Sequence, residues 1–224
     1  MSQLGPARVC LLVLCCGLCG CAGLGGLLTK ASSGDLAIRK KAYRRIEKVV
    51  RDLVPPNTRD AEKRAQVDQF LRQRFVDEKD TTLRSQIVAL AVQGEFDCAL
   101  ELVTAAIGDR KEQRLVRLIA IQHLRDFPLA EHRVLITDCL LHEQDLQLRI
   151  EAAKAFGGAG SHVDSPALWA TPLVNVFLDR HENLSLRFQA HRAASTLTGV
   201  ECSMDDEKGW RAWLAEHPVA AVRP

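Results

Sequence analysis

One short motif recurs four times along this chain and constrains its fold more than any other feature. A Leu-Arg or Val-Arg pair ends at Arg84, Arg117, Arg149 and Arg187, and the intervals between these arginines are 33, 32 and 38 residues. Ile or Ala follows each arginine by three positions, and Asp, Gln or Asn precedes it by four. Self-similarity at a nearly fixed period of this length is typical of proteins built from stacked units. The sequence therefore predicts a repeat architecture over residues 59–200.

Each repeated unit is predicted to be helical, because its apolar residues recur at steps of three and four. The clearest stripes are Ala42-Ile46-Val49-Leu53, Val67-Leu71-Phe75, Leu83-Ile87-Leu90 and Phe96-Leu100-Val103-Ile107. Gly and Pro residues fall between the stripes, at Pro55-Pro56, Gly94, Gly108 and Pro128. No segment has the alternating pattern of a β-strand. We therefore expect an all-α fold in which small residues such as Ala152 let neighbouring helices approach closely.

The first 20 residues have the composition of a signal peptide. Arg8 precedes ten uncharged residues, Val9 to Leu18. Leu18-Cys19-Gly20-Cys21 follows, and this segment resembles the lipobox at which bacterial lipoproteins are cleaved and acylated. The resemblance implies lipid attachment at Cys21 and a membrane-anchored lipoprotein on the periplasmic side of the bacterial cell envelope. The alternative is a single membrane-spanning helix over residues 9–29, a stretch without charged side chains.

The remaining chain has ordinary globular composition, with 47% hydrophobic and 26% charged residues. We expect a lipid-attachment cysteine and flexible linker at 21–34, a basic N-terminal helix at 35–58, repeats at 59–200, and a capping helix and tail at 201–224. Residues 30–80 hold 14 Lys and Arg against 9 Asp and Glu, whereas residues 81–224 hold 15 against 19. A basic cluster from Arg39 to Lys48 is predicted either to meet anionic lipid or to form a solvated helix face.

The segment Asp145 to Gly158 is similar to the second helix of HEAT-like repeats, in which an acidic turn precedes Val/Leu-Arg and a run of alanines. The resemblance covers residues 59–200 and implies an α-α superhelix, right-handed, of four to five antiparallel helix pairs. The chain departs from the pattern at Gln113, which replaces the acid, and at His191, where an apolar residue is expected. The fold is thus predicted to belong to the HEAT-like class.

Two sets of residues are candidates for special roles. Arg84, Arg117, Arg149 and Arg187 are expected to form a structural ladder that binds Asp80, Asp145 or helix-end carbonyls of the preceding unit. The alternative is a basic stripe that holds an acidic partner. Trp210 and Trp213 lie three residues apart and are predicted to cap the last repeat, with a ligand platform as the alternative.

No catalytic motif, metal site or cofactor is predicted. Cys98, Cys139 and Cys202 have no metal-binding or redox spacing and are expected to be buried thiols, with a Cys98–Cys139 disulfide as an alternative. His142-Glu143 and His181-Glu182 fall in polar turns before repeat helices.

The predicted function is a non-catalytic, membrane-tethered scaffold that binds a protein or peptide. We expect a monomer without nucleic-acid binding, since residues 81–224 are net negative. The alternative is an enzyme on a HEAT-like fold, resembling bilin lyases or alkylpurine DNA glycosylases.

Overall fold

A computed structural model describes residues 22–54, 60–126, 132–159 and 165–218, and within these ranges every regular element is a helix. The helices are α1 (Ala22–Ala31), α2 (Leu36–Asp52), α3 (Ala61–Asp77), α4 (Thr81–Gln93), α5 (Ala99–Gly108), α6 (Arg114–Asp126), α7 (Arg133–His142), α8 (Leu146–Ala159), α9 (Pro166–Leu178), α10 (Leu184–Thr198) and α11 (Glu207–Glu216). The prediction of an all-helical repeat superhelix is confirmed.

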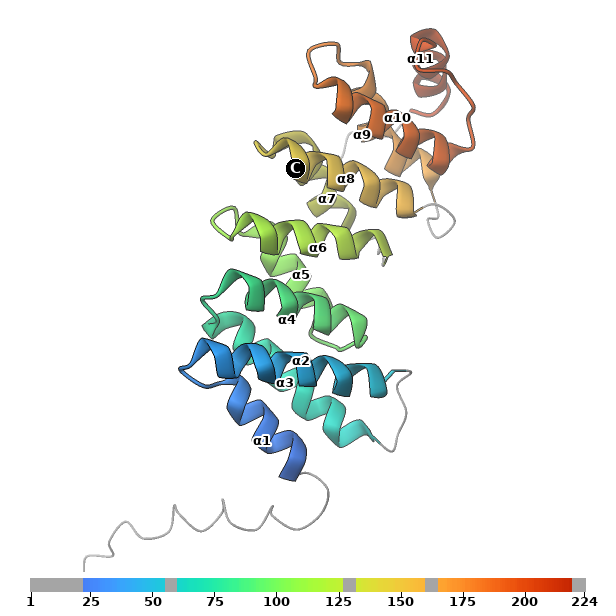
Figure 1. The fold of residues 1–224 in the computed structure, drawn as a ribbon. Helices are drawn as coiled ribbons and strands as arrows, with labels where there is room; N and C mark the ends of the chain where they lie inside the picture. The colour runs from blue at the N-terminus through green and yellow to red at the C-terminus, as the bar shows by residue number, and fades with distance from the viewer. Residues whose placement is uncertain (1–21, 55–59, 127–131, 160–164, 219–224) are drawn as a thin grey trace, which may run out of the picture.

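The helices form pairs that stack into one elongated molecule (Figure 1). The second helices of the pairs, α2, α4, α6, α8 and α10, lie side by side along one face, and each packs against the next. The first helices lie behind them and contact one another only sparsely. The second helices therefore form the continuous spine of the stack.

Local sequence explains where the second helices begin. The Asp80, Asp145 and Asn183 side chains accept hydrogen bonds from backbone N–H groups in the first turns of α4, α8 and α10. These are the residues that precede each repeat arginine by four positions, and they satisfy amide groups that have no partner within the helix. The acidic or amide position of the repeat is thus a helix N-cap.

Small residues on the second helices explain the close stacking. The residues three positions after the repeat arginines are fully buried: Ile87, Ala120, Ala152 and Ala190. Gly157 of α8 also allows close approach of a neighbouring helix. A Cβ added to it would lie 3.2 Å from both Cα and Cβ of Ala193 in α10. Neighbouring second helices therefore approach until their backbones nearly touch.

The repeat begins earlier than residue 59. Asp35 accepts hydrogen bonds from Ala37 N and Ile38 N as the N-cap of α2, Arg39 follows it by four positions, and buried Ala42 follows Arg39 by three. This is the spacing of the other four copies, with a longer interval of 45 residues before Arg84. The basic helix predicted at 35–58 is observed as α2, Leu36–Asp52, and its spacing makes it the second helix of a fifth pair.

The predicted linker is largely helical. The flexible linker at 21–34 is wrong for Ala22–Ala31, which form α1 and pack against α2 with Leu24 and Ala31 buried. Burial of these side chains outweighs the low helix propensity of Gly23, Gly25 and Gly26.

None of the described helices is long and apolar enough to cross a membrane. Cys21 and the signal peptide at 1–20 lie outside the described residues. The last eight residues of the predicted spanning stretch, 22–29, belong to α1.

Candidate partner-binding face

The repeat arginines lie at equivalent places along the stack, each between the first helix of its own pair and the turn of the next pair. Arg149 Nε donates to Leu140 O at 2.7 Å, and Arg187 Nε donates to Phe177 O at 2.8 Å. Arg117 Nη2 donates to Ile107 O at 3.3 Å, and Arg84 donates to Phe75 O. These acceptors lie in the last turns of the preceding first helices, where carbonyl groups lack intrahelical partners.

The acidic partners of the arginines differ from those expected. They are glutamates one unit further along the chain: Arg84–Glu112, Arg117–Glu143, Arg149–Glu182 and Arg187–Glu207. Arg39 adds a fifth rung with Glu78, at 3.2 Å between Nε and Oε2. Asp80 and Asp145 cap helices instead. We call this set of five ion pairs the arginine–glutamate ladder.

Glutamates of the ladder also accept hydrogen bonds from backbone N–H groups in the turns where they lie. Glu78 Oε1 accepts hydrogen bonds from Lys79 N and Asp80 N, and Glu143 Oε1 accepts from Gln144 N and Asp145 N. Glu112 accepts from Gln113 N in the same way. A glutamate one or two residues before the helix N-cap position was therefore the sequence signal for the partner of four of the five arginines. Glu207, the partner of Arg187, instead directly follows Asp206, the N-cap of α11. The alternative of a free basic stripe does not fit, because the guanidinium groups are already paired.

Electrostatics around Glu143 follow from this geometry. Burial opposes ionisation of the Glu143 carboxyl, but the hydrogen bond from Arg117 and those from two backbone amides outweigh it, so the pKa is lowered. Arg114 likewise lowers the pKa of Asp145 through a hydrogen bond. Both carboxylates are held in their charged forms.

Trp210 and Trp213 lie at the C-terminal end of the stack, where α11 packs on α9. The Trp210 ring is fully buried, and its centroid lies 5.9 Å from those of both Trp213 and His191. His191 in turn contacts Phe177 at 5.0 Å and forms a hydrogen bond with Cys202 O. His191, which departs from the repeat pattern, therefore connects the last repeat to α11.

The body cysteines are unpaired, so the disulfide alternative is not observed. Burial raises the pKa of Cys98 to about 12 and that of Cys139 to about 12. Cys202 is partly exposed. In the described parts of the chain no group of three or more His, Cys, Asp or Glu side chains is placed to hold a metal ion. His142 and His181 lie exposed beside ladder glutamates in the turns.

Exposed and partly buried apolar side chains of the second helices form rows in register. On three successive second helices, one apolar residue lies two or three positions before the repeat arginine, and another lies one position after it. They are Leu115 and Leu118 of α6, Leu146 and Ile150 of α8, and Leu184 and Phe188 of α10. Leu184 is 69% exposed and Phe188 45% exposed. We call these six residues the apolar row.

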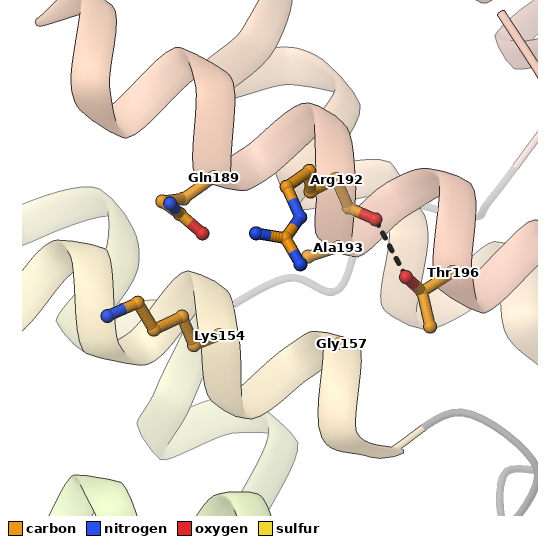
Figure 2. Close-up of a pocket in the computed structure, with 6 residues that line it drawn as sticks. All are labelled: Lys154, Gly157, Gln189, Arg192, Ala193 and Thr196. Atoms are coloured by element: carbon orange, nitrogen blue, oxygen red, sulfur yellow. Dashed lines mark hydrogen bonds between the residues drawn. The ribbon is translucent and has the colours of Figure 1, made fainter.

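A polar pocket continues the apolar row between α8 and α10. Steps of four residues lead from Leu184 and Phe188 to Arg192, and from Leu146 and Ile150 to Lys154, so the pocket shares their face. The pocket has a volume of about 460 Å³ and is lined by Lys154, Gly157, Gln189, Arg192, Ala193 and Thr196. Figure 2 shows Gln189 and Arg192 extending from α10 toward α8.

Two basic residues line the pocket, Lys154 and Arg192, and they differ in whether their charge is compensated. Lys154 Nζ lies 2.8 Å from Oε1 of buried Glu151, which compensates the ammonium charge. Arg192 is exposed and forms no ion pair with any described residue. The pocket therefore offers a free guanidinium beside amide and hydroxyl groups, a set that suits a carboxylate.

Comparison of the sequence with models of known protein families and with characterised proteins finds no match.

Proposed function

We propose that this protein is a lipid-tethered, HEAT-like repeat protein that binds a protein or peptide segment on the face of its second helices and catalyses no reaction. The tether is proposed from the resemblance of Leu18–Cys21 to a lipobox. The binding role is proposed from the exposed face of α6, α8 and α10. Stacked repeats commonly use such extended surfaces for binding.

The observation that supports binding best is the apolar row beside the pocket. Four members of this row are exposed, Leu115, Leu146, Leu184 and Phe188, and exposed apolar side chains on neighbouring helices mark a candidate interaction site. Arg192 lies at the end of this row on α10. The partner is therefore proposed to be a segment with apolar side chains and at least one carboxylate placed to reach Arg192.

Screening immobilised peptides against the purified full chain tests this proposal. We expect the retained peptides to combine apolar residues with Asp or Glu, and Phe188→Ser to weaken their binding at least about tenfold, as loss of a buried aromatic anchor does. Arg192→Gln should weaken acidic peptides and leave their amide analogues unchanged. Val76→Ser on α3 is the matched control, since Val76 is 73% exposed but lies on a first helix.

The binding proposal is overturned if Phe188→Ser and Val76→Ser bind the selected peptides equally. The tether is tested separately, by the intact mass of the protein extracted from membranes. A lipid increment on a chain that begins at Cys21 supports the tether, whereas an uncleaved chain beginning at Met1 contradicts it.

A further inference from the structure

The N-terminal end of the stack exposes a helix face that is covered everywhere else. In α4, α6, α8 and α10 one side of each second helix packs against the second helix before it. In α2 no described helix occupies that position, since α1 is the first helix of its pair (Figure 1). The residues on this side of α2 therefore determine what the N-terminal end of the stack can bind.

The contact between α8 and α10 identifies which positions lie on that side. The α10 residues that face α8 are Gln189, Arg192, Ala193 and Thr196, which line the pocket with Lys154 and Gly157 (Figure 2). They follow the repeat arginine, Arg187, by two, five, six and nine positions.

The same positions in α2, counted from Arg39, are Lys41, Arg44, Arg45 and Lys48. All four are basic and exposed. The equivalents of Arg45 in α4, α8 and α10 are Leu90, Ala155 and Ala193, all buried. At the position of Arg45 a charged residue has thus replaced a packing residue, and the other three positions carry charge where α10 has Gln189, Arg192 and Thr196.

The charge on this face is not compensated. α2 carries seven basic and two acidic residues, a net charge of +5. Of the two acids, Glu47 lies 3.9 Å from Arg51 on the same helix, and Asp52 is at its C-terminal end. Lys41, Arg44, Arg45 and Lys48 make no ion pair with any described residue.

One apolar side chain accompanies the charges. Ile38 is 44% exposed, although its equivalents Leu83, Val116, Leu148 and Leu186 are buried. Exposed aliphatic side chains next to Lys and Arg on one helix are the composition with which proteins bind the interface of an anionic bilayer.

We propose that the end face of α2, formed by Ile38, Lys41, Arg44, Arg45 and Lys48, docks onto an anionic lipid bilayer. This inference rests on the proposed function for the position of the membrane, since α1 begins one residue after Cys21 at the same end of the stack (Figure 1). The apolar row on α6, α8 and α10 then lies away from the lipid, open to its partner.

A bilayer fits this face better than a nucleic acid does. The charges lie on one helix at the end of the molecule, and the second-helix face beyond α4 does not continue them as a basic groove. Nucleic-acid sites extend cationic side chains along a backbone path. Exposed Ile38 adds apolar surface that an acyl interface covers and a phosphate backbone does not.

The test uses the full chain with vesicles of phosphatidylcholine alone or of equimolar phosphatidylcholine and phosphatidylglycerol. Lysine acetylation, followed by mass spectrometry, compares Lys41 and Lys48 of the end face of α2 with three exposed lysines elsewhere, Lys79, Lys111 and Lys208. We expect the α2 lysines to react about fivefold more slowly on the anionic vesicles, the factor expected for one cation held at an anionic surface. The other three should be unaffected, and protection should vanish at about 1 M salt.

A charge variant separates this face from general attraction. In the variant Lys41→Gln/Arg44→Gln/Arg45→Gln, the remaining reporter Lys48 should react equally on both kinds of vesicle. The matched control, Lys79→Gln/Lys111→Gln/Lys208→Gln, removes the same charge and should keep the protection of Lys41 and Lys48.

The outcomes distinguish this inference from the tether. Sedimentation with both vesicle types and equal acetylation of the α2 lysines overturns the docking face and leaves the tether. Sedimentation with anionic vesicles only, with the α2 lysines protected, supports docking and contradicts the tether. Failure to sediment with either kind of vesicle contradicts both the docking face and the tether. Protection of the α2 lysines by homopolymeric RNA but not by anionic vesicles assigns the face to nucleic acid and refutes the proposal.

Discussion

At the scale of single residues, the arginine–glutamate ladder connects each repeat to the next. Arg149, for example, donates to the Leu140 carbonyl at the end of α7 and to Glu182 in the following turn, so two elements depend on one side chain. The ladder is largely shielded from water: Arg117 and Glu143 are 7% and 11% exposed. Charged hydrogen bonds in such surroundings contribute more than surface ion pairs.

Substitution of Arg149 by Ala is expected to destabilise the fold by about 1–3 kcal/mol, because it leaves Glu182 and the Leu140 carbonyl without their donor. Urea unfolding followed by circular dichroism measures the change. Arg110→Ala is the control, since the Arg110–Asp138 pair is exposed and its loss should cost less than about 1 kcal/mol. Equal losses in the two variants would show that the ladder adds no stability.

Acidification should weaken the fold through Glu143, whose pKa is lower in the folded than in the unfolded chain. A lowered folded-state pKa stabilises the protein above the unfolded pKa of about 4.3, and this stability is lost as the pH falls through the folded pKa. The unfolding free energy of the native protein should therefore fall between about pH 5 and pH 3. Glu143→Gln should be less stable at neutral pH but lose less on acidification, whereas exposed Glu201→Gln should behave as the native protein does.

At the scale of elements, spacing between second helices depends on small residues at their crossings. Gly157 and Ala193 are the clearest case, because the contact involves the backbone of α10, which cannot move without moving the helix. Ordinary rotamer adjustment cannot relieve a clash with backbone.

Gly157→Val is therefore expected to destabilise the protein by about 1–3 kcal/mol, as overpacking does. Gly26→Val in α1 is the matched control, since an added Cβ meets no atom within 4 Å there. Valine favours a helix over glycine, so the control should be unchanged or slightly more stable. Thermal unfolding of both variants decides the point, and a stable Gly157→Val protein would contradict close packing of α8 and α10.

At the scale of the whole molecule, the two ends of the stack are finished in different ways. The C-terminal end is covered by α11, whose Trp210 and Trp213 rings are buried. The N-terminal end keeps α1 beside α2 and exposes the basic side of α2. A stack of repeats has apolar surface to cover at its ends, and here packing covers one end and charge replaces it at the other.

Removal of the aromatic cover should destabilise the whole stack. Trp210→Ala is expected to cost about 3–5 kcal/mol, since it empties a fully buried site of the largest side chain. Size-exclusion chromatography should then detect association through the uncovered end of α9 and α10. Arg211→Ala, an exposed neighbour on α11, should change the unfolding free energy by less than about 0.5 kcal/mol.

Sequence alone determined the helices, their approximate limits and the repeat, because periodicity, N-caps and breakers act within a few residues along the chain. It also placed Arg84 to Arg187 at equivalent positions and Trp210 with Trp213 on one face. Tertiary structure decided which groups those arginines meet, because Glu112 or Glu182 lies about one repeat away in sequence. It also made α1 a helix against its glycine content, gave α2 a place in the stack, and aligned the exposed residues of α6, α8 and α10. Those outcomes depend on burial and contact between distant segments, which no local pattern specifies.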